Sequence, residues 1–131
     1  MKNIILIIFG SIFITSCASA PAYVKEQAAL DLPKECFELL ISPGYQENAN
    51  ASSGWGLVHA YFAVGRYEST DKVAVCAYSF GGIGATTDLQ IKSNALYNCE
   101  QMRLNTMSSN ETIIKACEIY AEKNRILDKV D

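Results

Sequence analysis

Five cysteines constrain the fold of this 131-residue chain more than any other feature, and they fall into two groups. Cys17 stands alone at the end of an apolar N-terminal segment, whereas the others follow at separations of 40, 23 and 18 residues: Cys36, Cys76, Cys99 and Cys117. An even number of cysteines in a small exported domain is typical of a disulfide framework, and four cysteines allow three connectivities. The four include no C-x-x-C pair, so a zinc site built from them is the weaker interpretation.

The first 16 residues have the organisation of a secretory signal peptide. Lys2 precedes a mainly apolar run from residue 4 to residue 14, and small residues follow it. A helix that crosses a membrane needs about 20 apolar residues, so this run is too short for a permanent span. Export would place the four later cysteines in an oxidising compartment, where disulfides persist.

The residues around Cys17 carry a more specific signal. The sequence Ile14-Thr15-Ser16-Cys17 resembles the lipobox of bacterial lipoproteins, which has an aliphatic residue, two small residues and the cysteine that is acylated. The resemblance implies cleavage before Cys17, a diacylglycerol on its thiol and a further acyl chain, such as palmitate, on its amino group. Several acyl chains anchor a protein firmly, whereas a single chain binds a membrane only marginally. Because no aspartate follows the cysteine, the resemblance also implies an outer-membrane lipoprotein that faces the periplasm.

The alternative is an ordinary signal peptide cut at Ala18-Ser19-Ala20, with Cys17 there by chance. In the lipoprotein interpretation, residues 17–23 form a lipidated tether and residues 24–131 form a single domain. Loss of Lys2 changes 11 basic and 14 acidic residues to 10 and 14, which gives a formal charge of −4. A mildly acidic domain has no electrostatic footprint for nucleic acid, so we predict no such partner.

Hydrophobic periodicity and turn residues predict the elements of the domain. The first part contains helices at 24–31 and 33–41, a stop at 42–44, a polar loop at 45–54, and strands at 55–64 and 72–80 that pair as an antiparallel hairpin. In the second strand, Val73, Val75, Ala77 and Ser79 are expected on one face. The second part contains a helix at 88–104, a strand at 116–121, a turn at 123–124, and a short strand or tail at 125–130.

This order of elements predicts the fold class. We expect a compact α+β domain in which a small, mainly antiparallel sheet is packed by one main helix and stapled by two disulfides. In the chain-entropy model, each disulfide contributes about 3–4 kcal/mol, which is a large fraction of the stability of a small domain.

The C-terminal part of the chain carries a second resemblance. The segments Ala95–Glu100 (ALYNCE) and Ala116–Ala121 (ACEIYA) resemble a module of small exported bacterial proteins of unknown function. In that module a helix ends with the first cysteine and the second cysteine opens the next strand. The resemblance implies a Cys99–Cys117 disulfide, which leaves Cys36 to pair with Cys76. It brings no catalytic residues.

The candidate catalytic residues are few. His59 is the only histidine, so a serine or cysteine nucleophile would need it as general base. The enzymatic alternative is therefore a small periplasmic hydrolase that uses His59, with the backbone amides of Gly82–Gly84 as oxyanion donors. The structural alternative is a histidine inside an apolar strand and a flexible connection that lacks the third glycine of a dinucleotide-binding loop. Glu118 and Glu122 are interpreted as solvated residues rather than an acid/base pair.

Aromatic residues gather on the two predicted strands of the hairpin and the turn between them. Trp55, Tyr61, Tyr67 and Tyr78 are the candidate binding surface for an envelope protein or a cell-wall glycan, if one face of the sheet is left uncovered. The alternative is that these side chains build the core.

These observations favour an envelope-anchored lipoprotein with a non-enzymatic binding or structural role, held on the membrane by lipid on Cys17. No catalytic residue, metal ligand or cofactor is predicted. Besides the hydrolase, a third hypothesis is an inhibitor of a host or competitor enzyme, which would insert the loop at residues 42–54 into its target.

Overall fold

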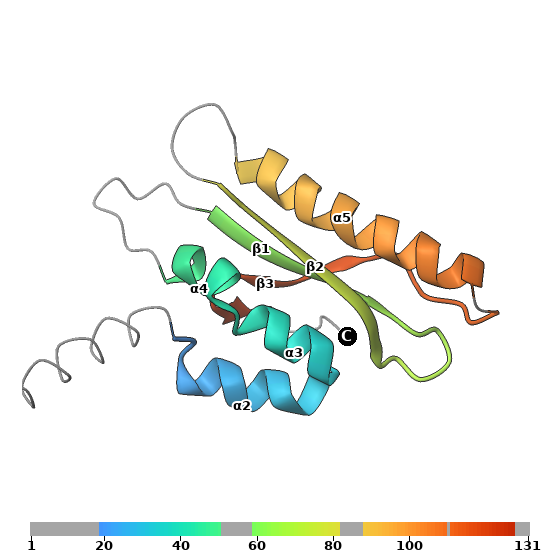
Figure 1. Cartoon of the computed structure of the whole chain (residues 1–131), viewed down its shortest axis with the longest axis horizontal. Coiled ribbons are helices and arrows are strands. Elements are labelled where there is room, and N and C mark those ends of the chain that lie inside the picture. The colour runs from blue at the N-terminus through green and yellow to red at the C-terminus, as the bar shows by residue number, and fades with distance from the viewer. Residues whose placement is uncertain (1–18, 51–58, 82–87, 110, 128–131) are drawn as a thin grey trace, which may run out of the picture.

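The computed structural model describes residues 19–50, 59–81, 88–109 and 111–127 (Figure 1). The elements in chain order are helices α2 (Ala22–Asp31), α3 (Lys34–Leu40) and α4 (Pro43–Ala49), strands β1 (His59–Arg66) and β2 (Val73–Gly81), helix α5 (Asp88–Ser109), and strands β3 (Glu118–Glu122) and β4 (Arg125–Ile126). The architecture is the α+β fold with an antiparallel sheet and one long packing helix that the sequence predicts.

The sheet has the strand order β2-β1-β3-β4, and each neighbouring pair is antiparallel. Strands β1 and β2 form the predicted hairpin, in which His59 lies opposite Gly81 and Arg66 lies opposite Val73. Strand β3 reaches the other side of β1 after the chain has passed through α5. Strand β1 is therefore an interior strand, paired with β2 on one side and with β3 on the other.

Helices cover both faces of the sheet (Figure 1). Helix α5 packs on one face with Tyr61 and Ala63 of β1, while α2, α3 and α4 pack on the other with Ala60, Phe62 and Val64. Side chains alternate between the faces of a strand, so β1 supplies both cores in turn. The second helical layer goes beyond the single main helix of the sequence-based prediction.

A β-bulge near the start of β2 changes the predicted alternation. Gly65 lies opposite Val75 and Arg66 lies opposite Val73, so Ala74 is an extra residue on the β2 side. A bulge resets the alternation of side chains along its strand. As a result Val73 packs with Cys76 beneath the three helices, whereas Val75 packs against α5. The prediction that Val73 and Val75 share a face is wrong for this reason.

Helix α4 occupies part of the segment predicted as a polar loop. Pro43 lies in its first turn, where the missing N–H of proline costs nothing, so this proline starts a helix instead of ending the previous one. Tyr45 and Ala49, four residues apart, are buried together with Gln46. The loop prediction is therefore wrong for residues 45–49. The apolar residues on the buried face of α4 are too few, among polar neighbours, to show a helical period in the sequence.

The domain begins earlier than the sequence suggests. The side-chain amide of Asn50 donates a hydrogen bond of 2.9 Å to the carbonyl oxygen of Ser19. Ala20 is 6% exposed and belongs to the core beneath the three helices. Helix α2 starts at Ala22, so residues 19–23, which were predicted as tether, are part of the folded domain.

Two disulfides connect helices to the strands of the sheet or to the residue next to a strand. Cys36 of α3 pairs with Cys76 of β2, and Cys99 of α5 pairs with Cys117, which lies just before β3. These are the two pairings that the C-terminal resemblance implies. Each bridge serves a different helical layer, so neither layer depends on apolar packing alone.

Candidate functional site

The predicted aromatic binding surface lies mainly in the core. Tyr61 is 4% exposed beneath α5, so its assignment to a binding surface is wrong. Tyr67 and Tyr78 are half-buried, and each packs against one of the two cores. Trp55 lies outside the described residues. The physical reason is that both faces of the sheet are covered: Tyr61 and Tyr67 pack in the core beneath α5, and Tyr78 packs in the core beneath α2, α3 and α4.

A polar cluster lies where β1 begins and α5 begins. The Nδ1 atom of His59 is 2.9 Å from Oδ1 of Asp88, and the hydroxyl of Tyr61 donates to the same oxygen at 2.6 Å. His59 and Tyr61 are two residues apart on a strand, which places both on the α5 face. Asp88 is in the first turn of α5, where the helix dipole favours a negative charge.

Glu122 completes this cluster from the neighbouring strand. It lies opposite Tyr61 in the pairing of β1 with β3. Burial, the hydrogen bond to Asp88 and the negative charge of Glu122 together raise the pKa of Tyr61 far above its ordinary value. Tyr61 is therefore a neutral hydrogen-bond donor between two carboxylates, and it cannot act as a phenolate nucleophile near neutral pH.

The cluster contains half of a hydrolytic arrangement. Asp88 can orient His59 in the manner of the third member of a triad. Within the described part of the chain, however, neither a hydroxyl nor a thiol is hydrogen-bonded to His59. Gly82–Gly84, the predicted oxyanion donors, lie outside the described residues.

The second polar cluster surrounds Arg66, whose side chain is 5% exposed. Its two terminal nitrogens donate to the two carboxylate oxygens of Asp31 at 3.0 and 2.9 Å. Its Nε donates to Glu118 at 3.0 Å, and one terminal nitrogen also donates to the backbone carbonyl of Asp71 at 3.1 Å. The hydrogen bonds to Asp31 are the main cause that raises the pKa of Arg66 above its ordinary value.

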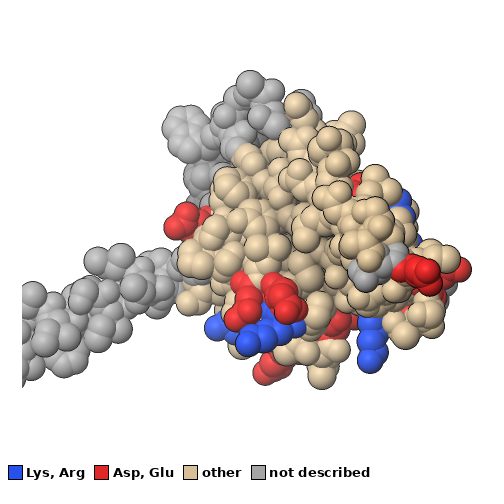
Figure 2. Space-filling model, turned by 45° about the vertical axis from the view of Figure 1, so that its right-hand side comes forward, with Lys and Arg blue, Asp and Glu red and all other residues tan. Residues whose placement is uncertain are grey.

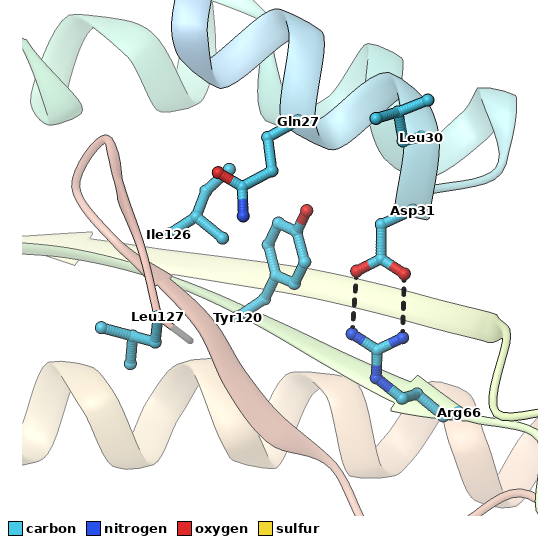
Figure 3. Close-up of a pocket in the computed structure, with 7 residues that line it drawn as sticks. All are labelled: Gln27, Leu30, Asp31, Arg66, Tyr120, Ile126 and Leu127. Carbon is cyan, nitrogen blue, oxygen red and sulfur yellow. Dashed lines mark hydrogen bonds and ion pairs between the residues drawn. The ribbon is translucent and has the colours of Figure 1, made fainter. Parts of the chain in front are cut away.

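A cavity of about 300 Å³ opens beside this ion pair (Figure 3). It is lined by residues of α2, of β1 and of the C-terminal segment: Gln27, Leu30, Asp31, Arg66, Tyr120, Ile126 and Leu127. The hydroxyl of Tyr120 points toward α2, is buried and has no hydrogen-bond partner in the described structure. Burial, with a smaller effect of Asp31, raises the pKa of Tyr120 to about 12, so this hydroxyl is neutral.

The lining of the cavity suits a small polar molecule and contains few reactive groups. It combines apolar side chains with a few fixed polar groups, which is the usual composition of a small-molecule site. The charge of Arg66 is already matched by Asp31 and Glu118, so a strongly charged anion gains little there. We define this cavity, with Arg66 and Tyr120 at its inner wall, as the Arg66 cavity.

Sequence reasoning missed the Arg66 cavity. Arg66 lies beyond residue 64, where the sequence predicts that the first strand ends, whereas the structure makes it the last residue of β1. Its partners Asp31 and Glu118 are 35 and 52 residues away along the chain. The one available signal is a cation directly after seven mainly apolar residues, which requires a partner if the strand is buried.

Glu118 and Glu122, weighed as an acid/base pair, belong to different clusters. Glu118 accepts a hydrogen bond from Arg66, whereas Glu122 forms an exposed ion pair with Arg125 and faces Tyr61. On the face shown in Figure 2, acidic and basic side chains lie beside one another and most of the surface carries neither charge. That face therefore offers no extended patch of one sign.

The described residues contain no group of three or more histidine, cysteine, aspartate or glutamate side chains placed to hold a metal ion. No helix in the same ranges is both long and apolar enough to cross a bilayer. No protein-family model, curated protein or solved structure matches the chain.

Proposed function

We propose that this protein is an exported lipoprotein, anchored in the cell envelope, whose domain has a non-enzymatic binding or structural role. The observation that carries export is the pair of disulfides, Cys36–Cys76 and Cys99–Cys117. Disulfides form and persist in oxidising compartments. The lipobox-like segment that ends at Cys17 supports the anchor, because several acyl chains on one cysteine give firm membrane attachment.

The proposed location is the periplasmic side of the outer membrane, and the proposed partners are an envelope protein or a cell-wall glycan. The Arg66 cavity, rather than the buried aromatic strands, supports the binding role. The hydroxyl of Tyr120 can donate to an acceptor on a neutral polar ligand, and the apolar side chains of Leu30 and Ile126 can cover the ligand's other surface.

The hydrolase remains the second candidate, because His59 is held by Asp88 as a general base would be. Among the described residues no hydroxyl or thiol is hydrogen-bonded to His59. The inhibitor hypothesis loses most of its proposed insertion loop. Residues 43–49 form α4, and Tyr45 and Gln46 are buried in the core.

Intact mass tests the anchored-lipoprotein proposal. The protein is isolated from membranes, with Cys17→Ser as the matched variant, and each is weighed before and after reduction. We expect acyl groups on the wild-type chain alone and a gain of four hydrogens on reduction in both, from two disulfides. A wild-type mature chain without acyl groups would contradict the anchor, and an unchanged mass after reduction would contradict the disulfides.

Co-sedimentation with purified cell-wall sacculi tests the glycan partner. We expect the wild-type domain to sediment and Tyr120→Phe to sediment less, because the phenylalanine cannot donate a hydrogen bond. Tyr97→Phe, at a 63% exposed position on α5, is the control and should match the wild type. Equal sedimentation of all three proteins would contradict the role of Tyr120, and no sedimentation would contradict the glycan.

A further inference from the structure

We infer that one end of the domain rests directly on the membrane surface, with its orientation fixed by the anchor. This end, the anchor end, consists of Ser19, Tyr23, Asn50 and the turn at residues 123–124. The inference rests on the proposed lipidation of Cys17, and it adds the surface that meets the bilayer. It also predicts which part of the domain faces away.

The start of the folded chain is held at the anchor end. The side-chain amide of Asn50 donates to the carbonyl oxygen of Ser19 at 2.9 Å, and Ala20 is buried in the core. Only Ala18 lies between Cys17 and Ser19, and a fully extended chain spans at most about 7 Å over these two Cα-to-Cα steps. A lipid on Cys17 therefore brings the headgroup region of the bilayer into contact with the domain.

The turn between β3 and β4 is joined rigidly to α4 at this end. Asn124 exchanges hydrogen bonds with Gln46 at 2.9 and 3.0 Å and donates to the side-chain oxygen of Asn50 at 3.0 Å. The hydroxyl of Tyr45 donates to the carbonyl oxygen of Lys123 at 2.6 Å. Because Gln46 and Asn124 are buried, this network holds the anchor end as one unit with the core.

The exposed side chains of the anchor end suit the interface of a membrane. Tyr23 is 60% exposed, while its hydroxyl donates to the carbonyl oxygen of Asn124 at 3.1 Å. Tyrosine is enriched at the level of lipid headgroups, where one part of its side chain is apolar and the other is polar. The Arg125 side chain beside the turn is 70% exposed but forms an ion pair with Glu122, so it adds little net charge at this end.

The opposite end of the domain faces away from the membrane. Helix α2 leads from the anchor end to Asp31 over ten residues, or about 15 Å. The turn between β1 and β2 lies at that far end, beyond Arg66 (Figure 1). The orientation therefore turns the Asp31 and Arg66 side of the Arg66 cavity away from the lipid, whereas Ile126, on its other side, directly follows the anchor end.

Photo-crosslinking to lipid tests the orientation. The full-length lipoprotein is purified from cells with p-benzoylphenylalanine at position 23 or at position 69, placed in phosphatidylglycerol-containing vesicles and irradiated. Ser69 is exposed in the far turn and is the matched control. We expect adducts with the mass of protein plus lipid when the probe is at position 23. No such adducts are expected when it is at position 69.

A longer tether provides the second arm. A Gly/Ser insert of about 12 residues before Ser19 spans about 20 Å on average and should release the anchor end from the surface. We expect the lipid crosslink at position 23 to fall while the acyl mass on Cys17 is unchanged. Equal crosslinking at positions 23 and 69, or no effect of the insert, would overturn the orientation. Absence of acyl mass would instead overturn the proposed function.

Discussion

The guanidinium of Arg66 and the carboxylate of Asp31 meet in a two-pronged hydrogen bond, with N–O distances of 3.0 and 2.9 Å. The contact joins the C-terminal turn of α2 to the last residue of β1. Glu118 of β3 adds a third hydrogen bond to the same guanidinium. One buried cation thus holds a helix and two strands at the far end of the domain.

Asp31→Asn is expected to destabilise the domain by about 2–3 kcal/mol, because it leaves a buried guanidinium without one of its charges. The value is below the range for fully buried pairs, since the Asp31 side chain is 36% exposed and partly screened. Asp71→Asn is the matched control. It breaks an ion pair with Lys115 in which both side chains are 49% exposed, and it should cost less than about 1 kcal/mol. Urea unfolding measures both, and equal losses would contradict the assignment.

Removal of the two disulfides should have unequal effects. Replacing Cys36 and Cys76 by alanine is expected to cost about 4 kcal/mol, and replacing Cys99 and Cys117 about 3 kcal/mol, since the bridges close loops of 40 and 18 residues. The measurement is the free energy of unfolding of each double variant under non-reducing conditions. A larger loss for the shorter loop would show that native packing, rather than chain entropy, sets the order.

Gly65→Ala tests the close approach of three side chains in the core beneath α5. A Cβ atom at this position would lie 2.9 Å from Cγ2 of Val75, 3.2 Å from Cγ2 of Ile114 and 3.3 Å from the sulfur of Cys117. We expect a loss of roughly 1–3 kcal/mol, as in other overpacked cores. Thermal unfolding of the variant measures it, and an unchanged midpoint would mean that Val75 moves at little cost.

Glu100 should make the domain sensitive to acid. Its carboxylate accepts hydrogen bonds from Arg103 and from the backbone N–H of Cys117, which lower its pKa below the ordinary 4.5. A carboxyl group with a lowered pKa stabilises the fold above its unfolded pKa, and this contribution is lost as pH falls through the folded value.

We therefore expect Glu100→Gln to be less stable than the wild type at neutral pH, with a difference that shrinks below pH 4.5. Urea unfolding across this pH range is the measurement. Glu111→Gln, at an exposed position, is the control and should follow the wild type throughout. A difference between Glu100→Gln and the wild type that stays constant with pH would contradict the role of the charge.

The sequence predicts those elements whose pattern is local. Strand β2 and helix α5 follow from alternating and helical apolar positions, although α5 continues to Ser109, beyond the expected residue 104. Helix α4 was missed because its buried residues, Tyr45 and Ala49, are too few to show a period among polar neighbours. The lipid on Cys17 stays a prediction.

The candidate sites were harder to predict than the elements. Arg66 and Asp31 are 35 residues apart, and no spacing rule links charges that meet only through tertiary packing. The aromatic residues misled for a related reason. Their strand pattern is the same whether one face or two faces of the sheet are covered. In the structure Tyr61 packs beneath α5 on one face, and Tyr78 packs beneath the short N-terminal helices on the other.

Strand β1 limits how this protein can vary. Seven of its eight residues are buried, and neighbours along it serve opposite helical layers. A substitution between Ala60 and Arg66 therefore disturbs the packing of one helical layer or the other. Many residues of α5 are exposed, and their identity can change with little effect on packing. Any natural relatives should keep this short segment nearly constant in size and polarity, which makes it the best probe for recognising them.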